Sequence, residues 1–119
     1  MRVWAADLPA LFAEAARGMY ALMELHLADS PRTARSFDVH ASDPESLLVA
    51  FLSELLYLLE NEHLAFEGFQ VVCGPDHLHV QMSGTAVQSQ THLVKAATYH
   101  NLEIQRKKGR YEAEIVFDV

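Results

Sequence analysis

The sequence contains few of the features that mark disulfide-rich, membrane-spanning or nucleic-acid-binding proteins. Its 119 residues include one cysteine, Cys73, which cannot form an internal disulfide and suits a reducing cytoplasm. Met1–Ala6 lacks the regions of a signal peptide, and no apolar run reaches the roughly 20 residues of a membrane span. Lys and Arg number 9 against 16 Asp and Glu, for a net charge of -7. We therefore expect a cytoplasmic protein that contacts no membrane and binds no nucleic acid directly, because phosphate recognition needs clustered basic residues.

The length and composition indicate one domain over residues 1–119 with a single hydrophobic core. Hydrophobic residues make up 50% of the chain and charged residues 21%, as in ordinary globular proteins. An acidic surface suits a protein partner that carries a basic one.

Two helices are predicted in the first half of the chain. Asp7 is a good N-cap, and apolar residues follow it at helical spacing as far as Met23. The second predicted helix spans residues 43–59 and begins with a capping box formed by Ser42 and Glu45. This second helix is apolar on every face, so the other elements are expected to cover it completely.

Alternating polar and apolar residues predict strands at 2–6, 32–41, 64–74, 77–82, 93–106 and 111–119. Turns are predicted at residues 74–76 and 107–109, a polar connection at 87–92, and a break in the long strand near residues 100–101. Because the helices come early and the hairpins late, the fold class is α+β, with two helices packed on a mixed or antiparallel β-sheet.

The seven histidines raise the question of a metal site. His77 and His79 are two apart on a predicted strand and therefore lie side by side. A structural zinc site needs about four nitrogen or sulfur ligands, and the sequence supplies one cysteine and no HExxH motif. The favoured interpretation is a solvated hairpin face. No GxSxG context, cysteine–base pair or glycine-rich phosphate loop points to nucleophilic or nucleotide chemistry.

Two places are harder to explain by folding alone. Residues 95–100, KAATYH, place one lysine and three hydrogen-bonding side chains on a predicted strand, although a solvated sheet face also fits them. At the other place, Asp118 stands beside the terminal carboxylate of Val119. Neighbouring anionic oxygens favour a hard cation such as calcium or magnesium, and a frayed terminus is the alternative.

Three stretches together resemble the archease family: LLVAFLSELLYLLENEHLAF, VKAATYHNLEI and the terminal IVFDV. The stretch AADLPALFAEAARGMYALM is similar to the first helix of that family, so the resemblance covers nearly the whole chain. It implies a small α+β fold in which one strand–helix–strand–strand module is nested in another.

The resemblance also implies a function. Archeases are accessory proteins of the RNA-splicing ligase RtcB in tRNA splicing and RNA repair. They promote guanylylation and multiple turnover of the ligase and are not enzymes themselves. By position, Lys95 matches the family lysine linked to ligase activation. Asp118 matches a C-terminal aspartate that binds a divalent metal ion, calcium or magnesium/manganese, and Val119 stands where a backbone oxygen joins that site.

The sequence departs from the family at its start. Archeases usually begin with a strand close to DHTADIG, whose second aspartate completes the metal site, whereas this chain begins just after that point. We therefore expect weak metal binding and self-association through a truncated edge strand. Two other hypotheses stay open: a metal-dependent chaperone or protein-binding module without a link to RNA ligases, and a hydrolase that uses His100 and Glu103.

Overall fold

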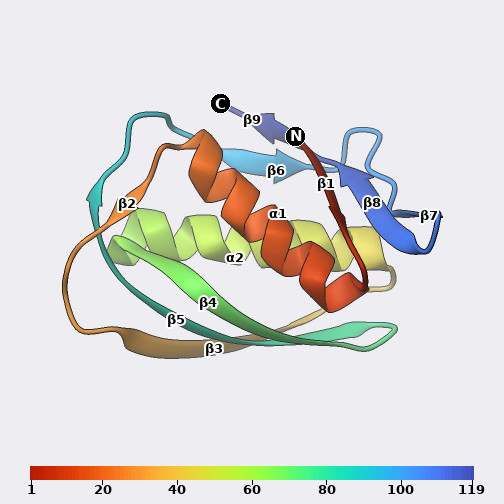
Figure 1. Cartoon of the computed structure of the whole chain (residues 1–119), viewed down its shortest axis with the longest axis horizontal. Coiled ribbons are helices and arrows are strands. Elements are labelled where there is room, and N and C mark those ends of the chain that lie inside the picture. The colour runs from red at the N-terminus through yellow and green to blue at the C-terminus, as the bar shows by residue number, and fades with distance from the viewer.

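The computed structural model describes all of residues 1–119, which form two helices and nine strands (Figure 1). The helices are α1 (Leu8–Leu22) and α2 (Pro44–Glu62). The strands are β1 (Arg2–Ala5), β2 (His26–Leu27), β3 (Thr33–His40), β4 (Leu64–Cys73), β5 (His77–Ser89), β6 (Ala96–Thr98), β7 (Gln105–Lys107), β8 (Arg110–Glu114) and β9 (Val116–Asp118). The predicted α+β class is confirmed, and neither helix combines the length and hydropathy needed to cross a lipid bilayer.

Both helices begin at an aspartate that accepts a hydrogen bond from the first turn. The carboxylate of Asp7 accepts from the Ala10 N–H at 2.8 Å, as the sequence predicted. In α2 the cap is Asp43, whose carboxylate accepts from the Ser46 N–H at 2.7 Å. The predicted capping box with Ser42 as N-cap is therefore wrong. Asp43 stands directly before the proline at the first helical position, and Ser42 donates its hydroxyl to the Asp43 carboxylate instead.

Helix α2 contains more buried residues than any other element, but it is not covered on every side. Its buried residues are Leu47, Leu48, Val49, Phe51, Leu52, Leu55, Leu56, Leu58 and Leu59. Ser53, Tyr57 and Glu60 are exposed and recur at helical spacing, so they form a narrow stripe that faces solvent. The expectation of complete burial was wrong for this stripe.

Strand β5 is the centre of the longest sheet, with β3 and β4 antiparallel on its two sides. The β4–β5 hairpin and its turn are confirmed. The predicted polar connection at residues 87–92 is wrong for its first part, because β5 continues to Ser89 and pairs there with β2. This last part of β5 has the polar composition of a loop because Gln88 and Ser89 are exposed to solvent. A bulge between Phe66 and Gly68 brings β4 close to β5 at Gly84.

The C-terminal part consists of short strands that change partner every few residues. The predicted strand at 93–106 is divided into β6 and β7, because the chain turns at Tyr99–Leu102 with Asn101 in the left-handed region at φ 50°. The predicted strand at 111–119 is interrupted at Ile115. Strand β8 pairs with β1 and β7, and β9 pairs with β6. Ala113 and Ile115 are buried and Tyr111 and Phe117 are half-buried, so these alternate residues of 111–119 face inward.

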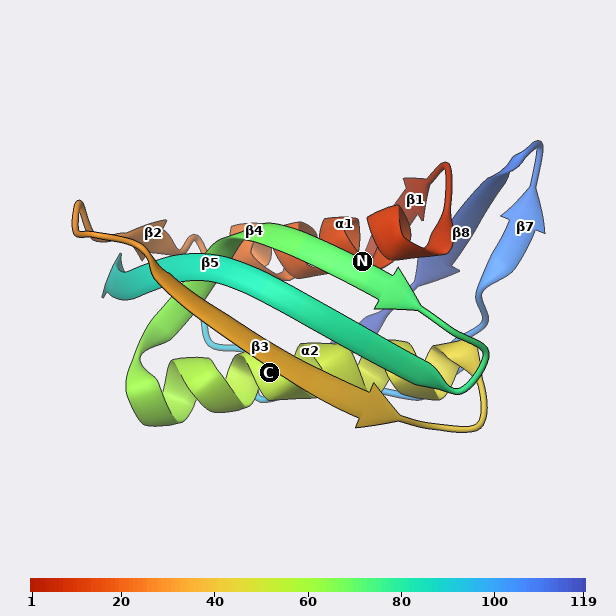
Figure 2. The same ribbon diagram turned by 90° about the horizontal axis from the view of Figure 1, so that it is seen from below.

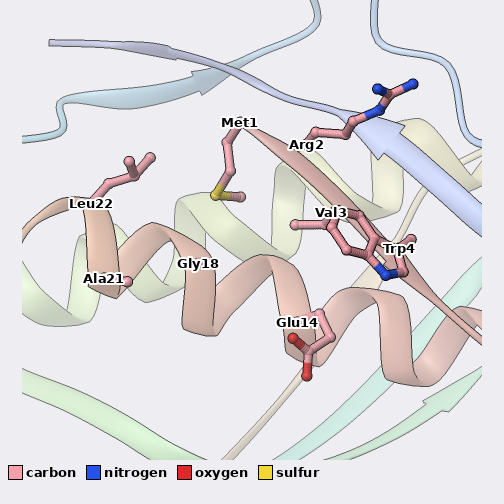
Figure 3. A pocket seen from close by; sticks show the side chains of 8 residues that line it. All are labelled: Met1, Arg2, Val3, Trp4, Glu14, Gly18, Ala21 and Leu22. Carbon is pink, nitrogen blue, oxygen red and sulfur yellow. The ribbon is translucent and has the colours of Figure 1, made fainter.

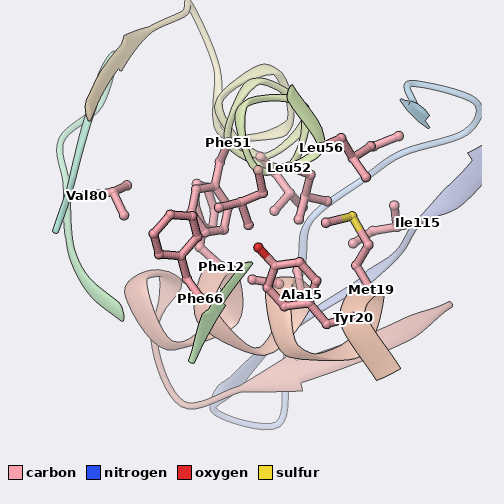
Figure 4. Close-up of a cluster of buried hydrophobic side chains, with 14 of the residues drawn as sticks. Phe12, Ala15, Met19, Tyr20, Phe51, Leu52, Leu56, Phe66, Val80 and Ile115 are labelled. Carbon is pink, nitrogen blue, oxygen red and sulfur yellow. The ribbon is translucent and has the colours of Figure 1, made fainter. Parts of the chain in front are cut away.

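The helices lie between the long sheet and the short strands (Figures 1 and 2). Phe51 of α2 stacks on Phe12 of α1 and on Phe37 of β3, with ring centroids 5.9 and 6.0 Å apart. The hydroxyl of Tyr20 points into this core and makes no hydrogen bond, although the Phe66 backbone lies nearby (Figure 4). Burial raises the pKa of Tyr20, since an ionised phenol would have no water around it. One core therefore joins all three layers.

Candidate functional site

The two-stranded ribbon of β6 and β9 brings together Lys95 and Asp118, two predicted site residues that lie apart in the sequence. Ala96 pairs with Asp118 and Ala97 pairs with Phe117. Just before β6, the Lys95 N–H donates a hydrogen bond to the Asp118 carbonyl oxygen at 2.7 Å. The Thr98 hydroxyl donates to the Val116 carbonyl oxygen at 3.0 Å and closes the other end of the ribbon. The backbone thus fixes the positions of Lys95 and Asp118 relative to each other.

The two faces of this ribbon have different surroundings. Ala97 is buried and Phe117 is half-buried, so their shared face packs toward α2. Directly paired residues share a face and successive residues alternate, so Ala96 and Asp118 lie on the outer face. Asp118 is exposed there. Lys95 precedes β6 and is also exposed.

Lys95 stands at the rim of a cavity of about 510 Å³ between α2 and the segment that precedes β6. Its apolar lining includes Met23, Leu56, Leu59, Leu93 and Val94. Glu60, His63 and Gln90 complete the polar part of the rim beside Lys95. An apolar floor with a few polar groups at the edge is typical of a site that receives part of another molecule.

The predicted metal ligands are Asp118 and Val119 at the end of β9. Both residues are exposed, and both offer carboxylate or carbonyl oxygens, the donors that calcium and magnesium prefer. No group of three or more His, Cys, Asp or Glu side chains stands ready to hold a metal ion in the structure. The donor chemistry fits a hard cation, but two residues supply fewer than the six or more oxygens that calcium takes. Metal binding by Asp118 and Val119 stays a prediction.

The outer edge of β9 is the unpaired strand edge at which the predicted self-association would occur. β9 pairs with β6 on one side, and its other edge pairs with no strand of this chain. β1 begins beside this point, since the Met1 amine and carbonyl groups bond to the backbone of Ile115 at 2.8 and 2.7 Å. An unpaired strand edge is a place where another chain can add. Self-association through this edge remains a prediction.

A second groove, of about 460 Å³, runs between α1 and β1 (Figure 3). It is lined mainly by apolar groups, and the Met1 side chain extends over Gly18. Trp4 is 53% exposed and Leu22 is 48% exposed along its sides. Neither Lys95 nor Asp118 lines this groove, so it is a separate surface.

The other sequence candidates have ordinary surroundings. His100 and Glu103 lie in the exposed segment between β6 and β7, and no hydrogen bond joins their side chains. Cys73 is half-buried at the end of β4, and burial raises the pKa of its thiol. A raised pKa lowers the fraction of reactive thiolate, which disfavours a nucleophilic role for this cysteine.

Sequence reasoning found only half of one cluster of polar side chains, because it placed His77 beside His79 but missed Asp38 and His40. The pairing of β3 with β5 sets Asp38 opposite His79 and His40 opposite His77 on the outer face of the long sheet. The alternation of Asp38-x-His40 and of His77-x-His79 was visible in the sequence. What the sequence did not contain was the register that places the two pairs beside each other.

The fold and the ribbon define a small α+β protein in which two helices are enclosed between a long antiparallel sheet and a set of short C-terminal strands. The model of the archease protein family (MTH1598/TM1083) matches residues 1–119. The chain belongs to the archease family.

Relatives and solved structures agree with this assignment. The chain is 35% identical over 99 residues to the protein archease of Methanosarcina mazei, covering 76% of this chain and 68% of that protein. It is 30% identical to the protein archease of Thermococcus gammatolerans, covering 100% of this chain and 90% of that protein.

Two solved structures share the fold. The archease of Thermotoga maritima, described as a possible chaperone, superposes with a TM-score of 0.75 at 15% identity over 100% of this chain and 88% of that one. Protein 1598 of Methanobacterium thermoautotrophicum superposes with a TM-score of 0.69 at 23% identity over 99% of this chain and 89% of that one.

Proposed function

We propose that this protein is an accessory factor of an RtcB-type RNA ligase, which promotes guanylylation and multiple turnover of the ligase in tRNA splicing and RNA repair. In this proposal the ligase carries out the catalysis in the cytoplasm, and the protein described here is not an enzyme. The observation that carries the proposal is the hydrogen-bonded pairing of Lys95 with Asp118 in a member of the archease family. Lys95 and Asp118 are the residues at which the sequence resembles the functional positions of that family.

The surroundings of Lys95 suit action on a partner protein. The lysine is exposed at the rim of an apolar cavity, so its ammonium group can reach a bound partner while its backbone stays fixed. An ammonium group stabilises negative charge that develops on a transferring phosphate. The net charge of -7 favours contact with a basic protein surface and disfavours direct contact with RNA.

Substitution of Lys95 tests this role. Lys95→Ala should abolish stimulation of ligase guanylylation and leave the fold intact, because an exposed side chain without an ion pair contributes little to stability. The measurement is transfer of label from GTP to the ligase, together with the melting temperature. Lys107→Ala is the matched control, since Lys107 is also exposed on a short strand of the same half. Full stimulation by a folded Lys95→Ala protein would contradict the proposal.

A metal-dependent chaperone or general protein-binding module is the second candidate function. The groove between α1 and β1, with its exposed Trp4 and Leu22, favours contact with apolar protein segments. A pull-down with an RtcB-type ligase separates the two candidates. Selective retention of the ligase supports the accessory role, whereas equal suppression of aggregation for unrelated unfolded proteins, without ligase binding, supports the chaperone.

A further inference from the structure

A compact group of three histidines and one aspartate lies on the outer face of the long sheet, distant in sequence from both Lys95 and Asp118. The Asp38 Oδ1 atom lies 2.8 Å from His77 Nε2 and 2.9 Å from His79 Nδ1. The rings of His40 and His77 stack with their centroids 4.5 Å apart. The side chains of Asp38, His77 and His79 are 37–50% exposed, so the group is open to solvent.

The register of two strands creates this group. Asp38 and His40 are two apart on β3, His77 and His79 are two apart on β5, and each pair stands directly opposite the other. Directly opposite residues have Cβ atoms roughly 4.5–5.5 Å apart and point to the same face. The four side chains therefore occupy the corners of one small rectangle on a rigid sheet.

We propose that Asp38, His40, His77 and His79 form a binding site for Zn²⁺ that joins β3 to β5. Imidazole nitrogen and carboxylate oxygen are donors that zinc binds, and four such groups match its preferred coordination number. This set differs from the oxygen donors of Asp118 and Val119, which suit calcium or magnesium. The two sites would therefore select different cations.

The site forms only when the ion enters. As the side chains stand, they are not arranged to hold a metal ion, because Asp38 Oδ1 occupies the point toward which the two imidazole nitrogens converge. Zn–N bonds are about 2.0–2.1 Å long, so each nitrogen has to move inward by less than about 1 Å once Asp38 rotates aside. The rotated carboxylate is then the third ligand, and His40, whose ring stacks on that of His77, is the candidate for the fourth.

Calorimetry with Zn²⁺ on protein stripped with a chelator tests the proposal. We expect one Zn²⁺ per chain and a higher melting temperature with zinc, since a ligand that binds only the folded state stabilises it. His77→Gln and His79→Gln should each weaken binding at least tenfold. His92→Gln and His100→Gln are matched controls, because both histidines are exposed and lie outside the group, and they should bind as tightly as the unaltered protein.

Two further measurements keep the outcome decisive. Co²⁺ in place of Zn²⁺ should give the intense visible absorption of a four-coordinate ion, and Asp38→Asn should reduce it. Asp118→Asn should leave zinc binding unchanged, which separates this site from the predicted C-terminal one. Absence of zinc binding, or binding that His77→Gln and His79→Gln weaken no more than His92→Gln does, would overturn the proposal. A His77→Gln protein that fails to fold is replaced by His40→Gln under the same criterion.

Discussion

The long strands β3, β4 and β5 and the short strands β6 to β9 lie on opposite sides of the two helices and follow different rules of construction. β5 keeps a continuous register with β3 over eight residue pairs, from Thr33 opposite Gly84 to His40 opposite His77. In the C-terminal half, the pairings of β6 with β9 and of β7 with β8 extend over only three residue pairs each. Long registers hold many side chains in fixed rows, whereas short ones bring single residues from distant segments together.

The long strands contribute mainly to stability, whereas the short strands carry the candidate functional residues Lys95 and Asp118. The long sheet supplies rows of core residues, and close backbone contact at Gly84 makes it intolerant of added volume. The short strands place Lys95 and Asp118 at exposed ends, where a substitution removes a chemical group and little packing. We therefore expect mutations in the long sheet to change stability first and mutations in the short strands to change activity first.

The largest expected effect is that of Gly84→Ala. A Cβ atom at this position would overlap the Ala65 carbonyl oxygen and lie 2.8 Å from the Phe66 Cα. Backbone cannot move aside as a side-chain tip can, so we expect a loss of about 3 kcal/mol in the free energy of unfolding. Denaturant unfolding measures it.

Gly68→Ala is the control for Gly84→Ala. The added Cβ would meet only the Ser83 Cβ at 3.5 Å, an ordinary contact. The free energy of unfolding should change by less than about 1 kcal/mol. If Gly84→Ala and Gly68→Ala lowered the free energy of unfolding equally, the close contact at Gly84 would not limit the stability of the long sheet. The proposed difference between the long and the short strands would then be wrong.

A smaller effect is expected at Asp43, which starts the helix on which both halves pack. The hydrogen bond from the Ser46 N–H, with further bonds from the Ser46 and Ser42 hydroxyls, holds the pKa of Asp43 below its ordinary value. A carboxyl group with a lowered folded-state pKa stabilises the protein above its unfolded-state pKa. This contribution is lost as the pH falls through the folded-state pKa.

Asp43→Ala should therefore lower the melting temperature at neutral pH, and the difference from the unaltered protein should shrink in acid. Asp43→Asn is the control, since asparagine caps a helix without titrating, and it should remove the pH dependence while keeping most of the stability. A melting temperature that Asp43→Ala leaves unchanged at pH 7 would show that the cap contributes nothing.

The smallest effect on stability, and the clearest test of the short strands, concerns calcium. With only Asp118 and Val119 as oxygen donors, the chain should bind calcium with a Kd of about 1 mM or weaker by calorimetry. In a chain that carries DHTADIG directly before Met1, continuation of the β1–β8 register would set the second aspartate of that segment opposite Asp118. That chain should bind calcium at least tenfold more tightly.

Asp118→Asn in the extended chain should remove the gain in calcium affinity. Tight binding by the chain without the extension would show that Asp118 needs no second aspartate. The same result would mean that the short strands form a complete site on their own, contrary to the prediction from the sequence.

The sequence by itself determined the helices, the β4–β5 hairpin and the α+β class, because these depend on periodic patterns within neighbouring residues. The tertiary structure decided where the C-terminal strands end, since 93–106 alternates well enough for one strand but is divided by a turn at Asn101. The resemblance to archeases identified Lys95 and Asp118. Only the pairing of β6 with β9 showed that these two residues share a backbone hydrogen bond. The tertiary structure also decided that Asp38 and His40 lie beside His77 and His79. Strand register is a non-local property that no single segment of the sequence contains.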